Sequence, residues 1–366
     1  MDKKEFKIKH SDLKSALNFC YKAIKSKPLV PAMGDFVLKL MNGTTLGVRA
    51  LNDEIGAYIR VPAEADSDFE FAVNATQLLS LVNSSSGDIK FSYSEEDGKV
   101  TVKPSRGKYD LFAQSPKDHP TQDISNESPV GKFDAIDFLH GVSATSPFAE
   151  NDEHQPWKGF VCLDASKDSS GIVATDGWSL SYRDEVKSDV SSNGQILISK
   201  TAADLITSMS GLKTVNVSTT GKFTVYRGGK EIIVQLNSVH KYPNYKGLFP
   251  KHSSHVSVSR SEFIEDLSRI INAAPETDHS VKIEFSTEDG LSIKAHDYDF
   301  GKQGVEVIEC SPTTNGSVVI NSKLMFNALR PRKSDDLLIY YMDEKSPLMI
   351  KGDDKITTLV MPIFQK

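Results

Sequence analysis

The feature that most constrains this chain is an internal repeat with a period of about 120 residues. Three segments each join a strand to an amphipathic helix: FAVNATQLLSLV, ILISKTAADLITSM and SVVINSKLMFNAL. Their helices are predicted to start at Asn74, Ser199 and Asn321, which lie 125 and 122 residues apart. Asn and Ser are good N-cap residues because their side chains accept hydrogen bonds from the free amides of a first helical turn.

Three more triplets of matching segments follow the same order. The segments LGVRALND, GIVATDG and LSIKAHD align Asn52, Asp176 and Asp297. A late proline recurs as Pro120, Pro243 and Pro362. A first helix recurs in SDLKSALNFCYKAI, FDAIDFLHGVSATS and SRSEFIEDLSRIINAA. Four matches in one order predict three homologous domains, at residues 1–126, 127–252 and 253–366.

Within each repeat the apolar residues of the strands alternate, as a half-buried sheet requires. Ile89, Phe91 and Tyr93 share one face, and the chain returns with Val100 and Val102. Each domain is therefore predicted to be α+β, with two helices on one face of antiparallel sheets. The terminal TTLVM is predicted to be the last strand of the third repeat, and a core strand does not explain the PIF that follows it.

Composition indicates an ordinary globular chain and excludes several function classes. The 366 residues include 43 Lys and Arg against 49 Asp and Glu, a net charge of −6. This balance argues against coating nucleic acid all round, but it permits one basic face. Cys20, Cys162 and Cys310 are widely spaced and are expected to be reduced. No run reaches the roughly 18 apolar residues that span a bilayer, and no signal peptide is expected.

The three repeats together with VATDGWSL, YPNYKGLFP and LVMPIF resemble the bacterial DNA polymerase III beta subunit family, the replicative sliding clamps. The resemblance covers the whole chain. It implies a head-to-tail homodimer, a ring of six domains whose helices line the hole and whose sheets form the outer wall. Such a ring encircles duplex DNA regardless of sequence, and it is a non-catalytic accessory subunit without cofactors. Its implied partners are the DNA polymerase III alpha subunit, the clamp loader and other proteins with clamp-binding motifs, on the nucleoid in the cytoplasm and not at a membrane.

The resemblance also implies a pocket that binds short linear peptides. Its residues here would be Trp157, Thr175, Gly177, Trp178, Leu180, Pro243, Leu248, Val360, Met361, Pro362, Ile363 and Phe364. Apolar walls with an adaptable Met and a few polar groups suit a peptide ligand. Trp178 and Ser179 stand where the family often has His and Arg, so we expect a different choice of partner peptides.

Two more sets of residues follow from the resemblance. The DNA-binding set is Lys14, Lys22, Lys25, Lys27, Lys200, Lys323, Arg330 and Arg332, with Lys333 beside it. The dimer interface would join Tyr109 and Leu111 on an edge strand to a helix end at Ile270, Ile271, Asn272 and Ala273. The acidic loop at 150–153 is expected to weaken DNA binding by repulsion. At the dimer interface, Asn272 and Ala273 offer less apolar area than the residues usual in the family, so we expect a weaker dimer.

Other interpretations remain open at this point. A clamp paralogue that binds peptides without encircling DNA is the main alternative. A hydrolase on the repeat scaffold would depend on His154, Asp176 and Asp297, yet TDG alone is typical of a tight turn. A metal site in the acidic loop lacks a recognisable ligand spacing, so no metal is predicted.

Overall fold

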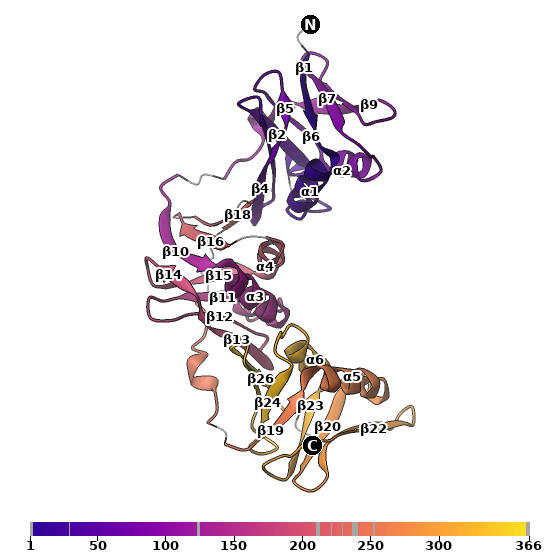
Figure 1. The fold of residues 1–366 in the computed structure, drawn as a ribbon, viewed down its shortest axis with the longest axis vertical. Coiled ribbons are helices and arrows are strands. Elements are labelled where there is room, and N and C mark those ends of the chain that lie inside the picture. The colour runs from indigo at the N-terminus through magenta and orange to yellow at the C-terminus, as the bar shows by residue number, and fades with distance from the viewer. Residues whose placement is uncertain are drawn as a thin grey trace. The chain divides into compact units, whose positions relative to one another are not determined.

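The computed structural model describes residues 3–28, 30–122, 125–209, 213–220, 222–228, 230–235, 241–251 and 253–363. The chain, drawn as a ribbon in Figure 1, separates into two compact units. Unit 1 comprises Met1–Ala135 with Leu205–Leu236, and unit 2 comprises Ile136–Asp204 with Asn237–Lys366. The strands of the second repeat are thus shared between the units. The three-domain division at 126 and 252 therefore stays a prediction.

The order of elements recurs with each repeat. The first has β1 (Lys4–Ile8), α1 (His10–Tyr21), η1 (Pro31–Gly34), β2 (Asp35–Met41), β3 (Thr45–Leu51), β4 (Ile55–Pro62), β5 (Glu64–Ala65), β6 (Glu70–Asn74), α2 (Ala75–Asn83), β7 (Ile89–Ser94), β8 (Lys99–Lys103), β9 (Tyr109–Gln114) and η2 (Pro116–Asp118). The second has β10 (Ser128–Asp134), α3 (Ala135–Thr145), η3 (Ser146–Phe148), η4 (Pro156–Gly159), β11 (Phe160–Ala165), β12 (Ser170–Thr175), β13 (Ser179–Val186), β14 (Ser188–Val190), β15 (Gly194–Ser199), α4 (Lys200–Thr207), β16 (Thr214–Thr219), β17 (Phe223–Arg227), β18 (Lys230–Gln235) and η5 (Lys246–Leu248). The third has β19 (His255–Ser259), α5 (Arg260–Ile270), η6 (Ile271–Ala273), β20 (Ser280–Ser286), β21 (Gly290–Asp297), β22 (Lys302–Ile308), β23 (Gly316–Asn321), α6 (Ser322–Leu329), β24 (Asp336–Tyr340), β25 (Leu348–Gly352) and β26 (Ile356–Val360).

The strands pair in antiparallel order within each unit. In unit 1 the order is β10-β16-β17-β18-β4-β3-β2-β6-β9-β8-β7-β1-β5. Unit 2 holds one sheet of order β15-β11-β12-β13-β26-β25-β24-β19 and another of order β22-β21-β20-β23. One arrangement thus recurs: β18-β4-β3-β2-β6 matches β26-β13-β12-β11-β15. In the third copy, β22 has β21 as its only sheet neighbour among the described residues.

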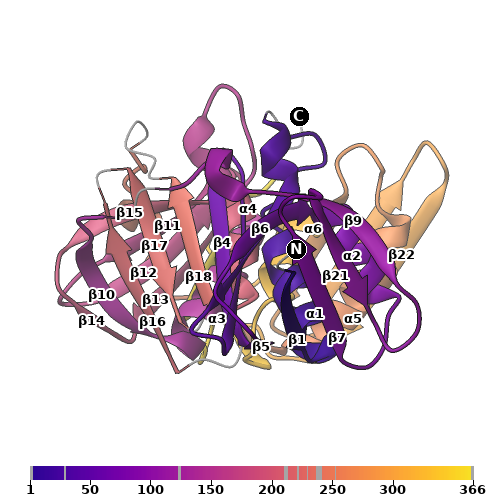
Figure 2. The ribbon, with the colours of Figure 1, turned by 90° about the horizontal axis from the view of Figure 1, so that it is seen from above.

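The helices pack on the sheets by apolar stripes. In α1, Leu13, Leu17 and Cys20 are fully buried, and the helix lies beside α2 (Figure 1 and Figure 2). Helix α5 packs against α6 and the strands β21 and β22. The predicted α+β arrangement is confirmed. No helix in the described part of the chain is both long and apolar enough to cross a membrane.

The predicted N-caps are confirmed. The Asn74 side chain accepts a hydrogen bond from the Gln77 amide at 3.1 Å. Ser199 Oγ accepts one from the Ala202 amide at 3.3 Å. The Asn321 side chain accepts bonds from Lys323 and Leu324 at 2.9 and 3.1 Å. Each cap satisfies amides that the first helical turn leaves free.

Candidate functional site

The turn between β12 and β13 is held by hydrogen bonds of two buried side chains. Asp176 Oδ1 accepts bonds from the amides of Trp178 and Ser179, at 2.8 and 2.6 Å. Thr175 Oγ1 donates to the Ser179 carbonyl at 2.6 Å and accepts from the Gly177 amide at 3.0 Å. Gly177 has a φ of +91°, a backbone region that favours glycine. The turn leaves the Trp178 side chain 64% exposed.

The carboxyl-terminal segment lies directly beside this turn. Strand β26 pairs with β13, so that Leu359 faces Leu180. The Met361 amide then donates to the Trp178 carbonyl at 2.8 Å. Pro362 forms a bridge with Ile320 on β23, and the Ile363 amide donates to the Val319 carbonyl at 2.7 Å. Part of the PIF segment is therefore fixed by backbone pairing.

The same face carries a dense apolar cluster. Its buried members are Cys162, Val173, Leu180, Leu197, Tyr242, Tyr245, Met349 and Leu359. Trp157, Phe160, Tyr182, Phe249 and Tyr340 pack partly buried against it. Trp157 meets Tyr242 edge to face, with ring centroids 6.0 Å apart. The Tyr245 hydroxyl donates to Asp164 at 2.8 Å, which fixes the segment that carries Pro243.

Most of the predicted pocket residues thus come together in unit 2. Leu180, Val360 and Pro362 are buried, and Pro243, Met361 and Ile363 are half-buried. Leu248, on η5, is 56% exposed. Phe364 lies outside the described residues. The aromatic side chains of Tyr182, Tyr242, Tyr245 and Phe249 were missing from the prediction, although the tyrosines and phenylalanine of KYPNYKGLFP were a visible signal.

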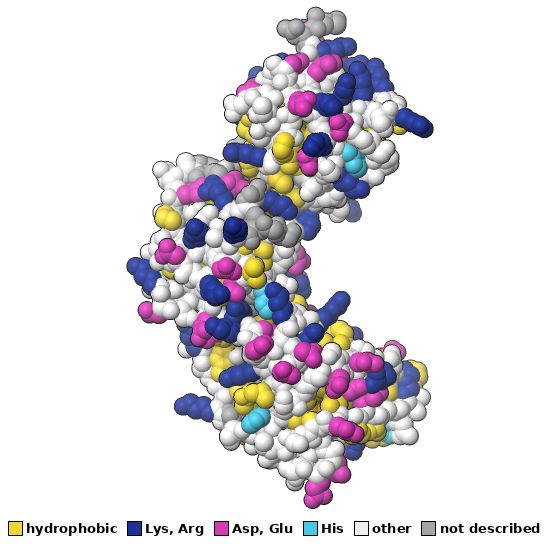
Figure 3. All heavy atoms as spheres, viewed as in Figure 1, with side chains coloured by type: hydrophobic (Ala, Val, Ile, Leu, Met, Phe, Trp, Pro, Cys, Tyr) yellow, Lys and Arg dark blue, Asp and Glu magenta, His cyan; other side chains and the backbone are white. Residues whose placement is uncertain are grey.

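The predicted DNA contacts comprise exposed side chains, side chains that already have partners, and one buried side chain. The side chains of Lys14, Lys22, Lys27, Lys323, Arg330 and Lys333 are exposed. Lys25 pairs with Asp53 at 2.7 Å and Glu54 at 3.6 Å, and Lys200 donates to the Ala149 carbonyl at 2.9 Å. Basic and acidic side chains are interspersed over the face in view (Figure 3).

The prediction that Arg332 contacts DNA is wrong. Its side chain is 3% exposed and bonds to the carbonyls of Ala328 and Ile350, at 3.2 and 2.8 Å. It also bonds to Thr358 and pairs with the buried Asp354, both at 3.1 Å. A guanidinium enclosed in this way cannot reach a phosphate. Arg332 is a core residue that fastens α6 to the last hairpin.

The predicted dimer residues lie on the strand β9 and at the end of the helix α5, where η6 follows it. Residues 109–112 of β9 pair with β8, and residues 113–114 pair with β6. Tyr109 is 47% exposed, and Leu111 is half-buried. Ile271 and Ala273 are half-buried and Asn272 is exposed, but Ile270 is 3% exposed. The prediction that Ile270 belongs to the dimer interface is therefore wrong, because its side chain is in the core of its own unit.

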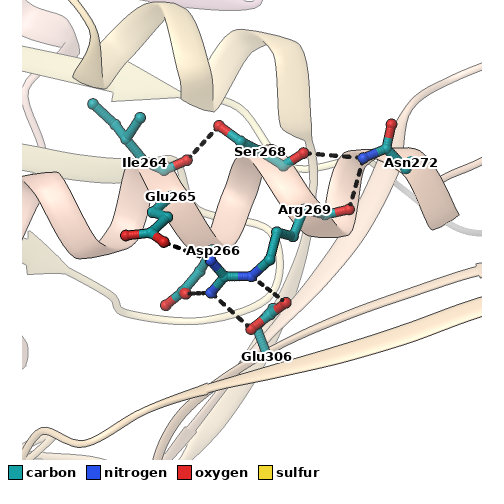
Figure 4. A network of polar contacts seen from close by, with 7 residues as sticks. All are labelled: Ile264, Glu265, Asp266, Ser268, Arg269, Asn272 and Glu306. Atoms are coloured by element: carbon teal, nitrogen blue, oxygen red, sulfur yellow. Dashed lines mark hydrogen bonds and ion pairs between the residues drawn. The ribbon is translucent and has the colours of Figure 1, made fainter.

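A polar network surrounds the helix end at Asn272 (Figure 4). The Arg269 guanidinium bonds to Glu306 on β22 at 2.9 Å and to Glu265 at 3.0 Å, and it also contacts Asp266. The Asn272 amide donates to the carbonyls of Ser268 and Arg269, at 3.2 and 3.1 Å. Asn272 therefore caps the helix carbonyls, and the surrounding surface is acidic.

The acidic loop is built as a turn. Asp152 Oδ1 accepts bonds from the His154 and Gln155 amides, at 2.8 and 3.0 Å. Its Oδ2 pairs with Lys158 at 3.1 Å. Within the described ranges, no group of three or more His, Cys, Asp or Glu side chains is placed to hold a metal ion.

Antiparallel sheets with two helices, which recur with each repeat of the element order, place the chain in the class of DNA-clamp folds. Comparison with known proteins agrees. The beta sliding clamp of Staphylococcus aureus (strain Mu50 / ATCC 700699) is 24% identical, over 98% of this chain and 99% of that protein. The beta sliding clamp of Synechocystis sp. is 21% identical, over 97% and 98%. No family model matches the chain.

Solved structures give the same result. The DNA polymerase sliding clamp of Bacillus subtilis superposes with a TM-score of 0.90 at 14% identity, over 100% of both chains. A sliding clamp (DNA polymerase III subunit beta) of Pseudomonas aeruginosa, bound to griselimycin, gives 0.89 at 18% identity, again over 100% of both chains. The chain has the sliding-clamp fold, and the resemblance seen in the sequence is confirmed.

Proposed function

We propose that this chain is a DNA sliding clamp, a processivity factor that encircles duplex DNA and tethers polymerases without doing chemistry itself. The observation that carries the proposal is the match to beta sliding clamps over the whole chain, in sequence and in fold. The hydrogen bond from the Met361 amide to the Trp178 carbonyl supports the peptide pocket in particular, because it joins the TDGW turn to the carboxyl-terminal segment beside one apolar cluster. The whole-length likeness to beta sliding clamps supports this function over the adaptor alternative.

The proposed peptide site combines a buried wall with an exposed rim. Trp178 and Leu248 are exposed apolar side chains, which a peptide could cover. Trp157, Pro243 and Met361 are half-buried beside them. The proposed site also includes the buried side chains of Thr175, Leu180, Val360 and Pro362. Gly177 and Ile363 complete the set. The partners we propose are the DNA polymerase III alpha subunit, the clamp loader and other proteins with clamp-binding motifs.

The proposed DNA contact is a loose set of exposed cations. Lys14, Lys22, Lys27, Lys323 and Arg330 can reach phosphates, and Lys25 and Lys200 would first have to leave their present partners. Phosphate contacts position a protein without reading sequence, which suits sliding. We place this activity on the nucleoid, in the cytoplasm.

The proposed ring closes by edge pairing between two copies. The strand segment at 109–112 and the strand β22 each have a free edge among the described residues. Tyr109 and Leu111 of one copy would meet Ile271, Asn272 and Ala273 of the other. Pairing would satisfy backbone groups at both edges.

Titration of a fluorescent Gln-Leu-x-Leu-Phe peptide tests the pocket. We expect micromolar binding, about −8 kcal/mol. Deletion of 361–366 should abolish it. Because that deletion also removes the Pro362 and Ile363 contacts, Trp178→Ala serves as a second variant with the tail intact and should weaken binding at least tenfold. Met342→Ala, at a 56% exposed Met elsewhere in unit 2, is the matched control. Equal binding by the Trp178→Ala and control variants would contradict this site.

A further inference from the structure

The face that forms the apolar cluster in the second repeat has a counterpart in unit 1. Gly56 lies four residues after Asn52, as Leu180 lies four residues after Asp176. Their registers agree as well, because Gly56 faces Ile233 on β18 and Leu180 faces Leu359 on β26. The two sites are therefore related by the repeat.

The unit 1 counterpart is polar where the second repeat is apolar. Arg49 pairs with Val37 and Tyr58 on the neighbouring strands. Val173 pairs with Cys162 and Tyr182 in the same way. By strand register, Arg49 in the first repeat therefore occupies the position that the fully buried Val173 occupies in the second repeat.

A missing side chain leaves a cavity at this position. The cavity has a volume of about 180 Å³, and its lining includes Arg49, Gly56, Tyr58, Gln122 and Glu231. A Cβ added to Gly56 would lie 2.0 Å from the Gln122 side-chain oxygen. Gln122 thus occupies part of the space that a leucine fills in the second repeat, and it brings an amide into the cavity.

Arg49 is a half-buried cation for which the described residues provide no hydrogen-bond acceptor and no ion-pair partner within 4 Å. Burial lowers the pKa of its guanidinium, and the more distant Glu70 carboxylate offsets this only in part. The nearby Glu231 carboxylate is engaged by Arg227 at 2.5 Å. The Tyr58 hydroxyl is likewise engaged, since it accepts a bond from Arg60 at 2.9 Å. A partly desolvated, unpaired cation favours an anionic ligand.

The third copy of this face makes a useful contrast. Lys294 takes the place of Arg49 by register, since it pairs with Lys282 and Val305. That cavity is larger, at about 620 Å³. Its two lysines, however, share Glu284 at 2.8 and 2.5 Å. Both cations of the third copy therefore have a carboxylate partner in contact, whereas Arg49 has no ion-pair partner within 4 Å among the described residues.

We propose that the unit 1 cavity binds a carboxylate-bearing peptide, with the carboxylate on Arg49 and the Gln122 amide beside it. The site is distinct from the peptide pocket at the chain's end and goes beyond the proposed clamp function. The guanidinium and a carboxylate match in geometry and charge. The cavity volume limits the enclosed part of the ligand to one acidic side chain or a carboxyl terminus.

Ligand-observed saturation-transfer NMR on the full chain tests the proposal. The probes are the capped tripeptides Gly-Glu-Gly and Gly-Gln-Gly, which differ only in the carboxylate. We expect binding of the Glu peptide with a Kd of about 1 mM, and at least fivefold less signal from the Gln peptide. Arg49→Met should lose the difference, and Arg106→Met, at an exposed arginine of the same unit, should keep it.

Two further variants separate this site from folding defects and from the terminal pocket. Gly56→Leu keeps Arg49 but fills the cavity, and it should also lose binding. Melting curves show whether each variant is folded. Deletion of 361–366 should leave the tripeptide signal unchanged. Equal signals from both peptides, undiminished binding by folded Arg49→Met, or loss of binding on the tail deletion would each overturn the proposal.

Discussion

Single side chains close the same turn in all three repeats. Asn52 accepts bonds from the amides of Glu54 and Ile55, at 2.7 and 2.9 Å. Asp297 accepts from Asp299 and Phe300, at 3.1 and 3.2 Å. Asp176 makes the equivalent bonds, and all three side chains are buried. The carboxylates of Asp176 and Asp297 are occupied by backbone amides, which removes the main support for a hydrolase in which these two residues are catalytic.

Arg332 gives a stability prediction at the scale of one residue. Burial lowers its pKa to about 10, and the charge is held by Asp354 and three oxygen acceptors. Arg332→Met would leave Asp354 buried and unpaired, so we expect a loss of about 3–5 kcal/mol in the free energy of unfolding. Urea denaturation measures it. The exposed Arg330→Met is the control and should change stability by no more than about 0.5 kcal/mol. Similar values for both variants would contradict the assigned role.

Glu127 gives a prediction about pH. Its two oxygens bond to Arg227 at 2.5 and 2.7 Å, which lowers the pKa of the carboxyl below its ordinary value of 4.5. The stabilisation is therefore present above pH 4.5 and is lost as the pH falls through the lowered pKa. We expect Glu127→Gln to cost about 1 kcal/mol at pH 7, discounted because Arg227 is partly exposed. Thermal melting from pH 7 to pH 3 should show the difference shrinking in acid. A difference that grows in acid would refute this assignment.

At the scale of elements, the end of α5 forms one side of the proposed dimer seam. Asn272 is exposed, and its amide is used on helix carbonyls, so it adds little apolar area to the proposed seam. Asn272→Leu should strengthen the dimer about tenfold, since burying a leucine contributes about 1.5 kcal/mol. Sedimentation across a dilution series measures the constant. Asn327→Leu, on an exposed position of α6, should leave it unchanged. A weaker or unaltered Asn272→Leu dimer would contradict the placement of the seam.

The helices and strands were largely predictable from sequence, but the contacts that side chains make with distant parts of the chain were not. N-caps and alternating strands are local signals, so Asn74, Ser199 and Asn321 could be placed by spacing alone. Arg332 could not be placed, because its partners Ile350, Asp354 and Thr358 lie 18 to 26 residues further along the chain, on a hairpin. Ile270 was misassigned for a related reason. A helix-end isoleucine gives no local sign of whether it faces the core or a partner.

At the scale of the whole molecule, the charge balance predicts weak contact with DNA. The net charge is −6, and the acidic loop carries Glu150 and Glu153 on exposed positions. Changing both to Gln should raise affinity for linear duplex severalfold at low salt, and the gain should fade as salt screens it. Asp152 is left intact because it closes the turn. Glu288→Gln with Glu344→Gln is the control of equal charge, and fluorescence anisotropy is the measurement. An equal gain in the control would mean that net charge alone is responsible.

Topological retention on DNA is the most direct test of the central claim. Leu111→Cys and Asn272→Cys place thiols on the two sides of the proposed seam, and Cys310→Ser removes the half-buried native thiol. The dimer is closed with a bismaleimide in the presence of nicked circular DNA and washed in about 1 M salt. We predict that the closed ring stays on the circle and leaves after one restriction cut. Loss from the uncut circle, or retention after cutting, would contradict a clamp that encircles DNA.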